Sequence, residues 1–259
     1  MFRWGLYSLR NLWARRVTTA LTVVGLGLVV FVLLAVLMLA HGLEQTLGKT
    51  GDPENVIILR KGALSEIGSS LSREEIRAVA AQPDVRLTAD GRPLAVAEVG
   101  LQLTLRKGQG GSLTSVTLRG TAPEALAVRP AIRLIQGRLW KPGTTEIVVG
   151  ASIARQFPDA RVDRVLHFGN WAWTVVGVFE AGGSGFDSEV WGDAEQFLAT
   201  FHRATFSSMT LRLAHPATLP AFKDRIERDP RFKFSVKREP EYYEGKAEGL
   251  AKMIRVTGL

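Results

Sequence analysis

The feature that most constrains the fold is a run of 24 residues without a charged side chain, from Val17 to Ala40. As a helix rising 1.5 Å per residue the run reaches about 36 Å, against roughly 30 Å of membrane hydrocarbon. A cleaved signal peptide is one alternative, because Ala40-x-Gly42 is a tolerable cleavage pattern, but its apolar core would be shorter. A buried helix of a soluble protein is the other, but such a helix would rarely run so long without a charge. We therefore predict a transmembrane helix over residues 17–41.

The charges beside this run predict its orientation. The first sixteen residues contain Arg3, Arg10, Arg15 and Arg16 and no acidic residue, and Glu44 follows the run. By the positive-inside bias we expect a cytoplasmic N-terminus, determined chiefly by the last three arginines, and an extracytoplasmic domain after residue 41. The rest of the chain carries 29 Lys and Arg (33 minus these four) against 25 Asp and Glu, which argues against a nucleic-acid-binding surface.

Residues 1–16 have the pattern of an amphipathic helix. Phe2, Leu6, Leu9 and Trp13 recur at spacings of four, three and four residues. Phe2, Trp4 and Trp13 are suited to the headgroup layer, so we expect an interfacial anchor in the cytoplasmic leaflet. A docking role for this segment is the alternative.

The end of the apolar run superficially resembles a nucleotide-binding loop. Gly48-Lys49-Thr50 matches the last three positions of a P-loop, but five residues separate it from Gly42 where four are required. A P-loop also follows a buried strand and opens a helix, whereas this stretch follows the apolar run. We interpret residues 42–54 as a stalk and linker, with Gly48 ending the stalk helix.

The remaining pattern indicates an α+β domain. A strand at 55–61 and a helix with the capping-box pair Ser72 and Glu75 are followed much later by strand, helix and strand. Residues 55–90 and 205–240 therefore predict a βαβ-type α+β module. Between them, residues 91–204 predict an inserted β-rich subdomain, with hairpins turning at "GQGG" and at Gly169-Asn170.

Residues 241–259 predict a helix with Tyr243, Ala247, Leu250 and Ile254 on one apolar stripe. We interpret this helix as a stalk that returns toward the membrane. By position alone, the residues that we expect to couple stalk movement to the domain are Leu43, Leu47, Tyr243, Leu250 and Ile254.

The sequence offers no catalytic constellation. It contains no cysteine, no paired histidines at metal-ligand spacing, and no H-E-x-x-H or G-x-S-x-G motif. The glycine-rich segment 182–189, "GGSGFDSE", reads as an ordinary connection between strands, with a flexible partner-contacting loop as the alternative. We expect no catalytic residue, no metal site and no cofactor in this chain.

The chain as a whole resembles the permease subunits of the MacB/FtsX-like ABC transporter family. The segments that carry the resemblance are "RNLWARRVTTALTVVGLGLVVFVLLAVLML", "NVIILRKGA", "GRLWKPGTTEIVVGASIARQF", "WTVVGVFEAGGSGFDSEVW" and "YYEGKAEGLAKMIRVTGL". The resemblance implies one span leading to a periplasmic ferredoxin-like porter module with a β-rich insert. Three further spans normally follow in that family, so we expect this chain to be a fragment of such a permease.

The same resemblance implies a location in the bacterial inner membrane and a mechanical function. A cytoplasmic ABC ATPase subunit would supply the energy, a second permease copy would complete a homodimer, and a periplasmic adaptor protein would be a further partner. The external domain would move to export cargo or to signal. The alternatives are a single-pass envelope scaffold or receptor without transport and, less favoured, a membrane-anchored hydrolase.

Overall fold

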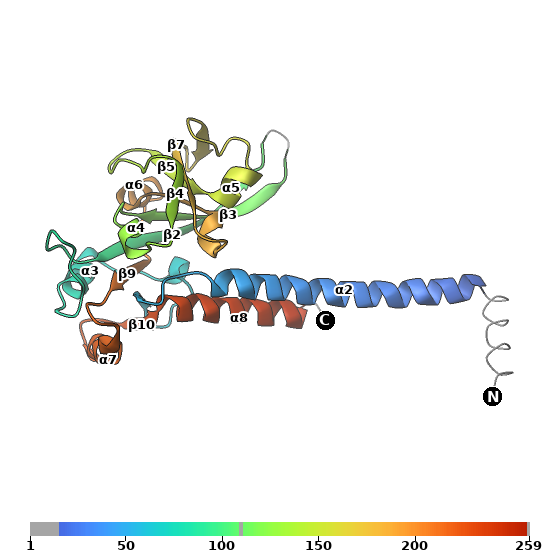
Figure 1. Cartoon of the computed structure of the whole chain (residues 1–259), viewed down its shortest axis with the longest axis horizontal. Coiled ribbons are helices and arrows are strands. Elements are labelled where there is room, and N and C mark those ends of the chain that lie inside the picture. The colour runs from blue at the N-terminus through green and yellow to red at the C-terminus, as the bar shows by residue number, and fades with distance from the viewer. Residues whose placement is uncertain (1–15, 109–110, 258–259) are drawn as a thin grey trace. The chain divides into compact units, whose positions relative to one another are not determined.

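The computed structural model describes residues 16–108 and 111–257. The chain divides into two compact units, one formed by Met1–Gln45 with Ala247–Leu259 and the other by Thr46–Lys246. Two helices, α2 (Arg16–Gly48) and α8 (Glu239–Thr257), each run from one unit into the other. The larger unit is the mixed domain of Figure 1 and holds every strand that the structure describes.

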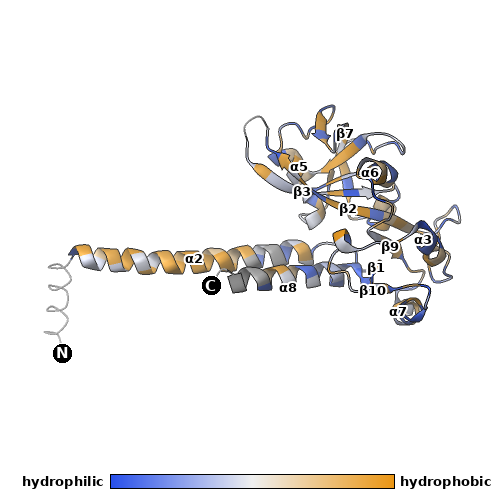
Figure 2. Ribbon diagram, turned by 180° about the vertical axis from the view of Figure 1, so that it is seen from behind, coloured by the Kyte–Doolittle hydropathy of each residue, from blue (hydrophilic) through white to orange (hydrophobic). Residues whose placement is uncertain are grey.

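The smaller unit contains an apolar helix. Within α2, residues Arg16–Leu39 are long and apolar enough to cross a membrane, and no other described helix is. The apolar side chains of this stretch are exposed, with Phe31 at 68% and Met38 at 72%, and Figure 2 shows the hydrophobic colouring along the helix. A helix with an exposed apolar surface of this length fits a membrane-anchored protein.

The first and last segments of the larger unit together form a four-stranded antiparallel module. Its elements in chain order are β1 (Asn55–Arg60), α3 (Arg73–Ala80), β2 (Ala95–Arg106), β9 (Ser208–Arg212), α7 (Leu219–Arg228) and β10 (Phe234–Arg238). The strands lie side by side in the order β10-β1-β9-β2, and all three pairs are antiparallel. This is the split βαβ arrangement of ferredoxin-like folds.

Local sequence explains why these elements form. Ser72 caps α3, with its Oγ accepting from the Glu75 N–H at 3.2 Å while its own N–H donates to Glu75 Oε2 at 2.8 Å. The predicted capping box is therefore confirmed. Helices α3 and α7 cover one face of the sheet, where Val56, Ile58 and Phe222 are at most 2% exposed within one core cluster.

The inserted part continues the sheet. Its elements are β3 (Leu113–Thr121), α4 (Ala125–Val128), β4 (Arg133–Gly137), β5 (Glu146–Gly150), α5 (Ala151–Gln156), β6 (Val165–Phe168), β7 (Trp171–Glu180), β8 (Glu189–Asp193) and α6 (Ala194–Thr200). The strand order from β2 onward is β3-β8-β5-β7-β4, with β6 also paired to β7. Because β3 with β8 and β5 with β7 run parallel, the sheet is mixed.

Strand β2 belongs to both parts of the domain. Its residues Ala95 to Glu98 pair with β9, and its residues Val99 to Arg106 pair with β3. One continuous backbone therefore links the ferredoxin-like strands to the insert without a flexible linker. The predicted boundaries near residues 90 and 205 stay a prediction, because both parts lie in one compact unit.

The predicted hairpins are present. Strands β6 and β7 pair antiparallel around Gly169 and Asn170, whose φ values are 59° and 61°. Positive φ at both central residues is what a tight hairpin turn of this kind requires. Strands β2 and β3 form the second hairpin, whose turn includes residues 109–110, which lie outside the described part.

We expect Gly150→Ala to destabilise the domain by roughly 1–3 kcal/mol or more. Gly150 joins β5 to α5. An added Cβ would overlap the backbone carbonyl of Asp187, which lies in the buried segment between β7 and β8. The measurement is the urea dependence of tryptophan fluorescence for the full chain in detergent. Gly68→Ala is the control, because a Cβ there meets nothing within 4 Å. Equal midpoints for the two variants would contradict the packing argument.

Candidate functional site

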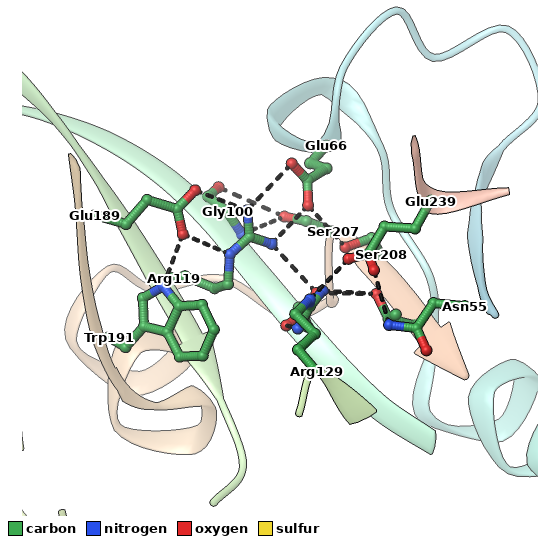
Figure 3. A network of polar contacts seen from close by, with 12 residues as sticks. Asn55, Glu66, Gly100, Arg119, Arg129, Glu189, Trp191, Ser207, Ser208 and Glu239 are labelled. Atoms are coloured by element: carbon green, nitrogen blue, oxygen red, sulfur yellow. Dashed lines mark hydrogen bonds and ion pairs between the residues drawn. The ribbon is translucent and has the colours of Figure 1, made fainter. Parts of the chain in front are cut away.

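The most distinctive feature of the larger unit is a buried network of two arginines and four glutamates, shown in Figure 3. Each of the six side chains is at most 10% exposed. The members come from separate segments of the chain: Glu66 (3₁₀ helix η1, Glu66–Gly68), Glu98 (β2), Arg119 (β3), Arg129 (after α4), Glu189 (β8) and Glu239 (start of α8). The network thus joins the ferredoxin-like strands, the insert and the first turn of α8.

Arg129 joins the two carboxylates of the ferredoxin-like side. Its two terminal nitrogens donate to Glu98 Oε1 and Oε2 at 2.8 Å each, and its Nε donates to Glu239 Oε1 at 2.7 Å. A bidentate guanidinium–carboxylate pair fixes direction as well as distance. Arg129 therefore connects β2 to Glu239, which lies 110 residues from Arg129 in the sequence.

Arg119 connects the ferredoxin-like side of the network to the insert. Its Nε and one terminal nitrogen donate to Glu189 at 2.7 and 2.9 Å, and its other terminal nitrogen donates to Glu66 Oε1 at 2.7 Å. It also reaches Glu98 at 3.2 Å and the hydroxyl of Tyr243 at 3.2 Å. All five N–H groups of a guanidinium are donors, and this geometry uses all three nitrogens.

Four carboxylates outnumber two guanidinium groups, so neutral donors complete the network. The donors are Ser208 to Glu66, Thr210 to Glu98, Trp191 to Glu189, and the side chain of Asn55 and backbone N–H of Asp52 to Glu239. A carboxylate away from water requires partners for both oxygens, since an unpaired buried charge is very costly. The network meets that requirement through side chains of several strands.

The charges shift the pKa values of the network. Burial alone would raise the pKa of Glu98, but Arg129 and Arg119 outweigh it and lower that pKa to about 2. Burial opposes the charged form of Arg129 as well, yet Glu239 and Glu98 raise its pKa. Burial raises the pKa of Tyr243, so its hydroxyl stays protonated. Glu98 and both arginines are therefore ionised across the physiological range.

The glycine-rich segment 182–189 packs directly on the network. Phe186 presents its ring to both guanidinium groups, with Arg129 Cζ at 5.0 Å and Arg119 Cζ at 5.3 Å from the ring centroid. The segment also supplies Glu189, and the Gly185 N–H donates to Thr50 Oγ1 at 2.8 Å. The segment connects β7 to β8, and Ser184, Phe186 and Asp187 within it are buried. It links the end of α2 to the network.

The structure places the residues singled out in the sequence as follows. Arg16 begins α2, Leu47 lies near its end against Gly185, Tyr243 contacts Arg119, and Leu250 lies on α8 at 37% exposure. Phe2, Trp4, Arg10, Trp13 and Arg15 lie outside the described residues, as do the side chains of Leu43 and Ile254. Of these residues, the structure brings only Tyr243 into the network.

Gly48-Lys49-Thr50 lies at the C-terminal end of α2, the opposite of its place in a P-loop. Thr50 Oγ1 donates to the Thr46 carbonyl at 3.0 Å and accepts from the Gly185 N–H, so both roles of the hydroxyl are used. The expectation that Gly48 ends the stalk helix is confirmed. Among the described residues no group of three or more His, Cys, Asp and Glu side chains is arranged to hold a metal.

Sequence reasoning missed the six charged residues of the network. Glu98 and Arg119 each follow apolar residues inside predicted strands, in "AVAEVG" and "VTLRG", where alternation suggests a solvent-facing side chain. A charge one or two residues before a glycine, in a strand with apolar residues on both faces, is the signal that could have indicated burial. No local signal pairs Glu98 with Arg129, because partner choice depends on the folded topology.

The comparison with protein families decides what kind of domain this is. Residues 19–229 match the model of the MacB-like periplasmic core domain. The chain belongs to this family. No curated protein matches the MacB-like chain described here.

Solved structures share the fold of this MacB-like domain. The extracellular domain of the noncanonic ABC-type transporter YknZ from Gram-positive bacteria aligns with a TM-score of 0.54 and 13% identity, covering 71% of this chain and 99% of that one. The periplasmic region of MacB from Actinobacillus actinomycetemcomitans aligns with a TM-score of 0.54 and 14% identity, covering 78% and 92%. The expected α+β fold after one N-terminal apolar helix and the expected family are therefore confirmed.

We expect Glu98→Gln to lower the free energy of unfolding by about 3–5 kcal/mol at neutral pH, because it leaves two buried guanidinium groups short of a charge. The pKa of Glu98 falls on folding from 4.5 to about 2. Its stabilising contribution is therefore complete above pH 4.5 and is lost as the pH falls toward 2.

Urea unfolding of the full chain at a series of pH values checks this prediction. The difference between wild type and Glu98→Gln should shrink steadily below pH 4.5. The matched control is Glu244→Gln, at an exposed position on α8, which should track the wild type at every pH. A difference that stays constant down to pH 2 would contradict the ionised state assigned to Glu98.

Proposed function

We propose that this chain is part of a permease subunit that couples ATP hydrolysis by a separate ATPase subunit to movement of its extracytoplasmic domain. The N-terminus would lie in the cytoplasm and the larger unit outside the bacterial inner membrane, in keeping with the arginines before the apolar run. The complex would serve export or mechanical signalling. The chain would need no cofactor of its own, and a second permease copy and an adaptor protein would complete the assembly.

The main support for the proposal is that the network binds the segment that follows α2 to the start of α8. Just after α2, the Asp52 N–H donates to Glu239 Oε2 at 3.0 Å, and Asp52 pairs with Arg212 at 2.5 Å. Glu239 itself begins α8. Asp52, just after one helix, and Glu239, at the start of the other, are thus bound to each other, and Glu239 is also bound to Arg129.

Buried ion pairs of this kind resist deformation. Removing one partner of a buried pair costs about 3–5 kcal/mol, so small displacements are transmitted rather than absorbed. A shift of the segment around Thr50 would act on Gly185, and through Phe186 and Glu189 on Arg119 in the insert. This continuous set of contacts supports movement of the larger unit as one rigid body.

Family membership supports an external source of energy. One structural relative is the extracellular domain of an ABC-type transporter, YknZ, and the other is the periplasmic region of MacB. The chain has no complete P-loop, so we infer that ATP binds to a partner subunit. ATP can move this domain only if the assembly binds the nucleotide differently in two conformations.

The test uses a pair of engineered cysteines, Leu47→Cys and Leu250→Cys, in the full chain within membranes of its native host. The natural sequence has no cysteine, so each label position is unique. Spin labels at the two positions should report different distance distributions in the nucleotide-free state and after trapping with ATP and vanadate. The difference is expected because the two helices would move when the ATPase closes.

A second labelled pair, Ser70→Cys with Gln102→Cys, lies on exposed positions within the larger unit. This pair should give one distance in every nucleotide state if the unit moves rigidly. Identical distributions for the Leu47 and Leu250 labels in all states would instead favour a single-pass scaffold with no transport role.

A further inference from the structure

A groove on the insert, away from the ion network, gathers positive charge. It has a volume of about 480 Å³ and lies between α5, residues 161–164 and strands β4 and β7. Its principal lining residues are Ile135, Gln136, Arg155, Arg161, Val162 and Arg164. We call it the arginine groove. A groove of this size is large enough to hold a few side chains or a small ligand.

The three arginines lack the carboxylate partners that other arginines of the domain have. Arg60, Arg73 and Arg138 each form a two-pronged ion pair with a glutamate. Arg155, Arg161 and Arg164 are exposed and form no ion pair with any carboxylate in the described ranges, and Arg155 donates only to Ser152 Oγ, at 3.1 Å.

Two acidic side chains lie on the same segment. Asp159 and Asp163 are both exposed, and within the described part of the chain neither forms an ion pair with a groove arginine. The groove therefore presents more positive than negative charge, which favours an anionic partner.

The floor of the groove is apolar. Ile135 is 55% exposed and lies at a β-bulge, where the pairing of β4 with β7 shifts between Leu134 and Gln136. A bulge leaves its extra residue outside the regular pairing and redirects the side chain. Val162, Ala154 and Val178 continue the apolar lining. A partner that fits must bring apolar as well as acidic groups.

Strand β4 also offers a free backbone edge. It ends the strand order and, among the described strands, pairs only with β7. An edge strand carries unpaired N–H and C=O groups that can accept another extended segment. An anionic lipid or a free phosphate could neutralise the arginines but would leave this edge unused. An extended peptide uses the backbone edge, the apolar floor and the charges together.

We propose that the arginine groove binds an extended acidic segment of a partner protein, added alongside β4 with its carboxylates on Arg155, Arg161 and Arg164. Because Ile135 and the three arginines line the same groove, the side chains on the groove-facing side of such a segment must include both acidic and apolar groups. This site is separate from the ion network, and it stands whether or not the chain couples ATP hydrolysis.

The probe is a fluorescent peptide of Glu-Glu-Val-Val repeats, which puts both Glu and Val on each face of an extended strand. It is titrated with the full chain in neutral detergent and followed by fluorescence anisotropy. The double variant Arg161→Glu with Arg164→Glu should weaken binding at least tenfold, because it places like charges opposite the peptide. The matched control, Arg77→Glu with Arg86→Glu, changes net charge equally at exposed positions on the other part of the domain. It should bind like the wild type.

Two further measurements separate a peptide site from a simple anion site. Ile135→Asp should weaken binding as well, while a peptide with Lys in place of Glu should not bind the wild type. Equal weakening by the groove and control variants would overturn the proposal. So would displacement of the peptide by equimolar inorganic phosphate, or loss of peptide binding when phosphatidylglycerol is added to the micelles, since either would assign the arginines to a small anion or a lipid.

Discussion

The pairing of Arg129 with Glu98 and Glu239 is the interaction on which the rest of the structure depends. A guanidinium group with 2% exposure is tolerable only when its counter-charges lie at fixed positions. One of those positions is on β2 and the other is where β10 gives way to α8. Strands β2 and β10 and helix α8 must therefore adopt one relative arrangement. In any other arrangement the buried guanidinium group of Arg129 would have neither a counter-charge nor water.

Apolar packing around the charges reinforces this arrangement. Trp191 is fully buried, lies against Phe179 at 4.8 Å between ring centroids with the ring planes tilted by 42°, and donates its indole N–H to Glu189. Phe186 faces Trp191 at 5.6 Å as well as the two guanidinium groups. Aromatic rings exclude water from the ion pairs and attract the cations through their faces. The same aromatic side chains thus contribute to the apolar core and shield the ion pairs from water.

The sequence predicted what depends on neighbours along the chain. The capping box at Ser72, the turn at Gly169 and the end of α2 at Gly48 all follow from local chemistry. The ion network could not be predicted in this way, because Arg119 and Glu66 are 53 residues apart and Arg129 and Glu239 are 110 apart. Pairing at that distance follows from strand order, which local periodicity does not determine. The segment 182–189 connects β7 to β8, as predicted, but its local sequence does not indicate that Phe186 is buried against two distant arginines.

The sharing of β2 has a consequence for how the domain can be divided. A fragment that ended β2 after Glu98 would remove the partner of β3, and a fragment that began β2 at Val99 would remove the partner of β9. A long, largely apolar strand with an open side is a template for adding identical strands from other molecules. The two parts are therefore better regarded as a single folded body than as separable modules, and a cut within β2 would convert a folded domain into an aggregation-prone one.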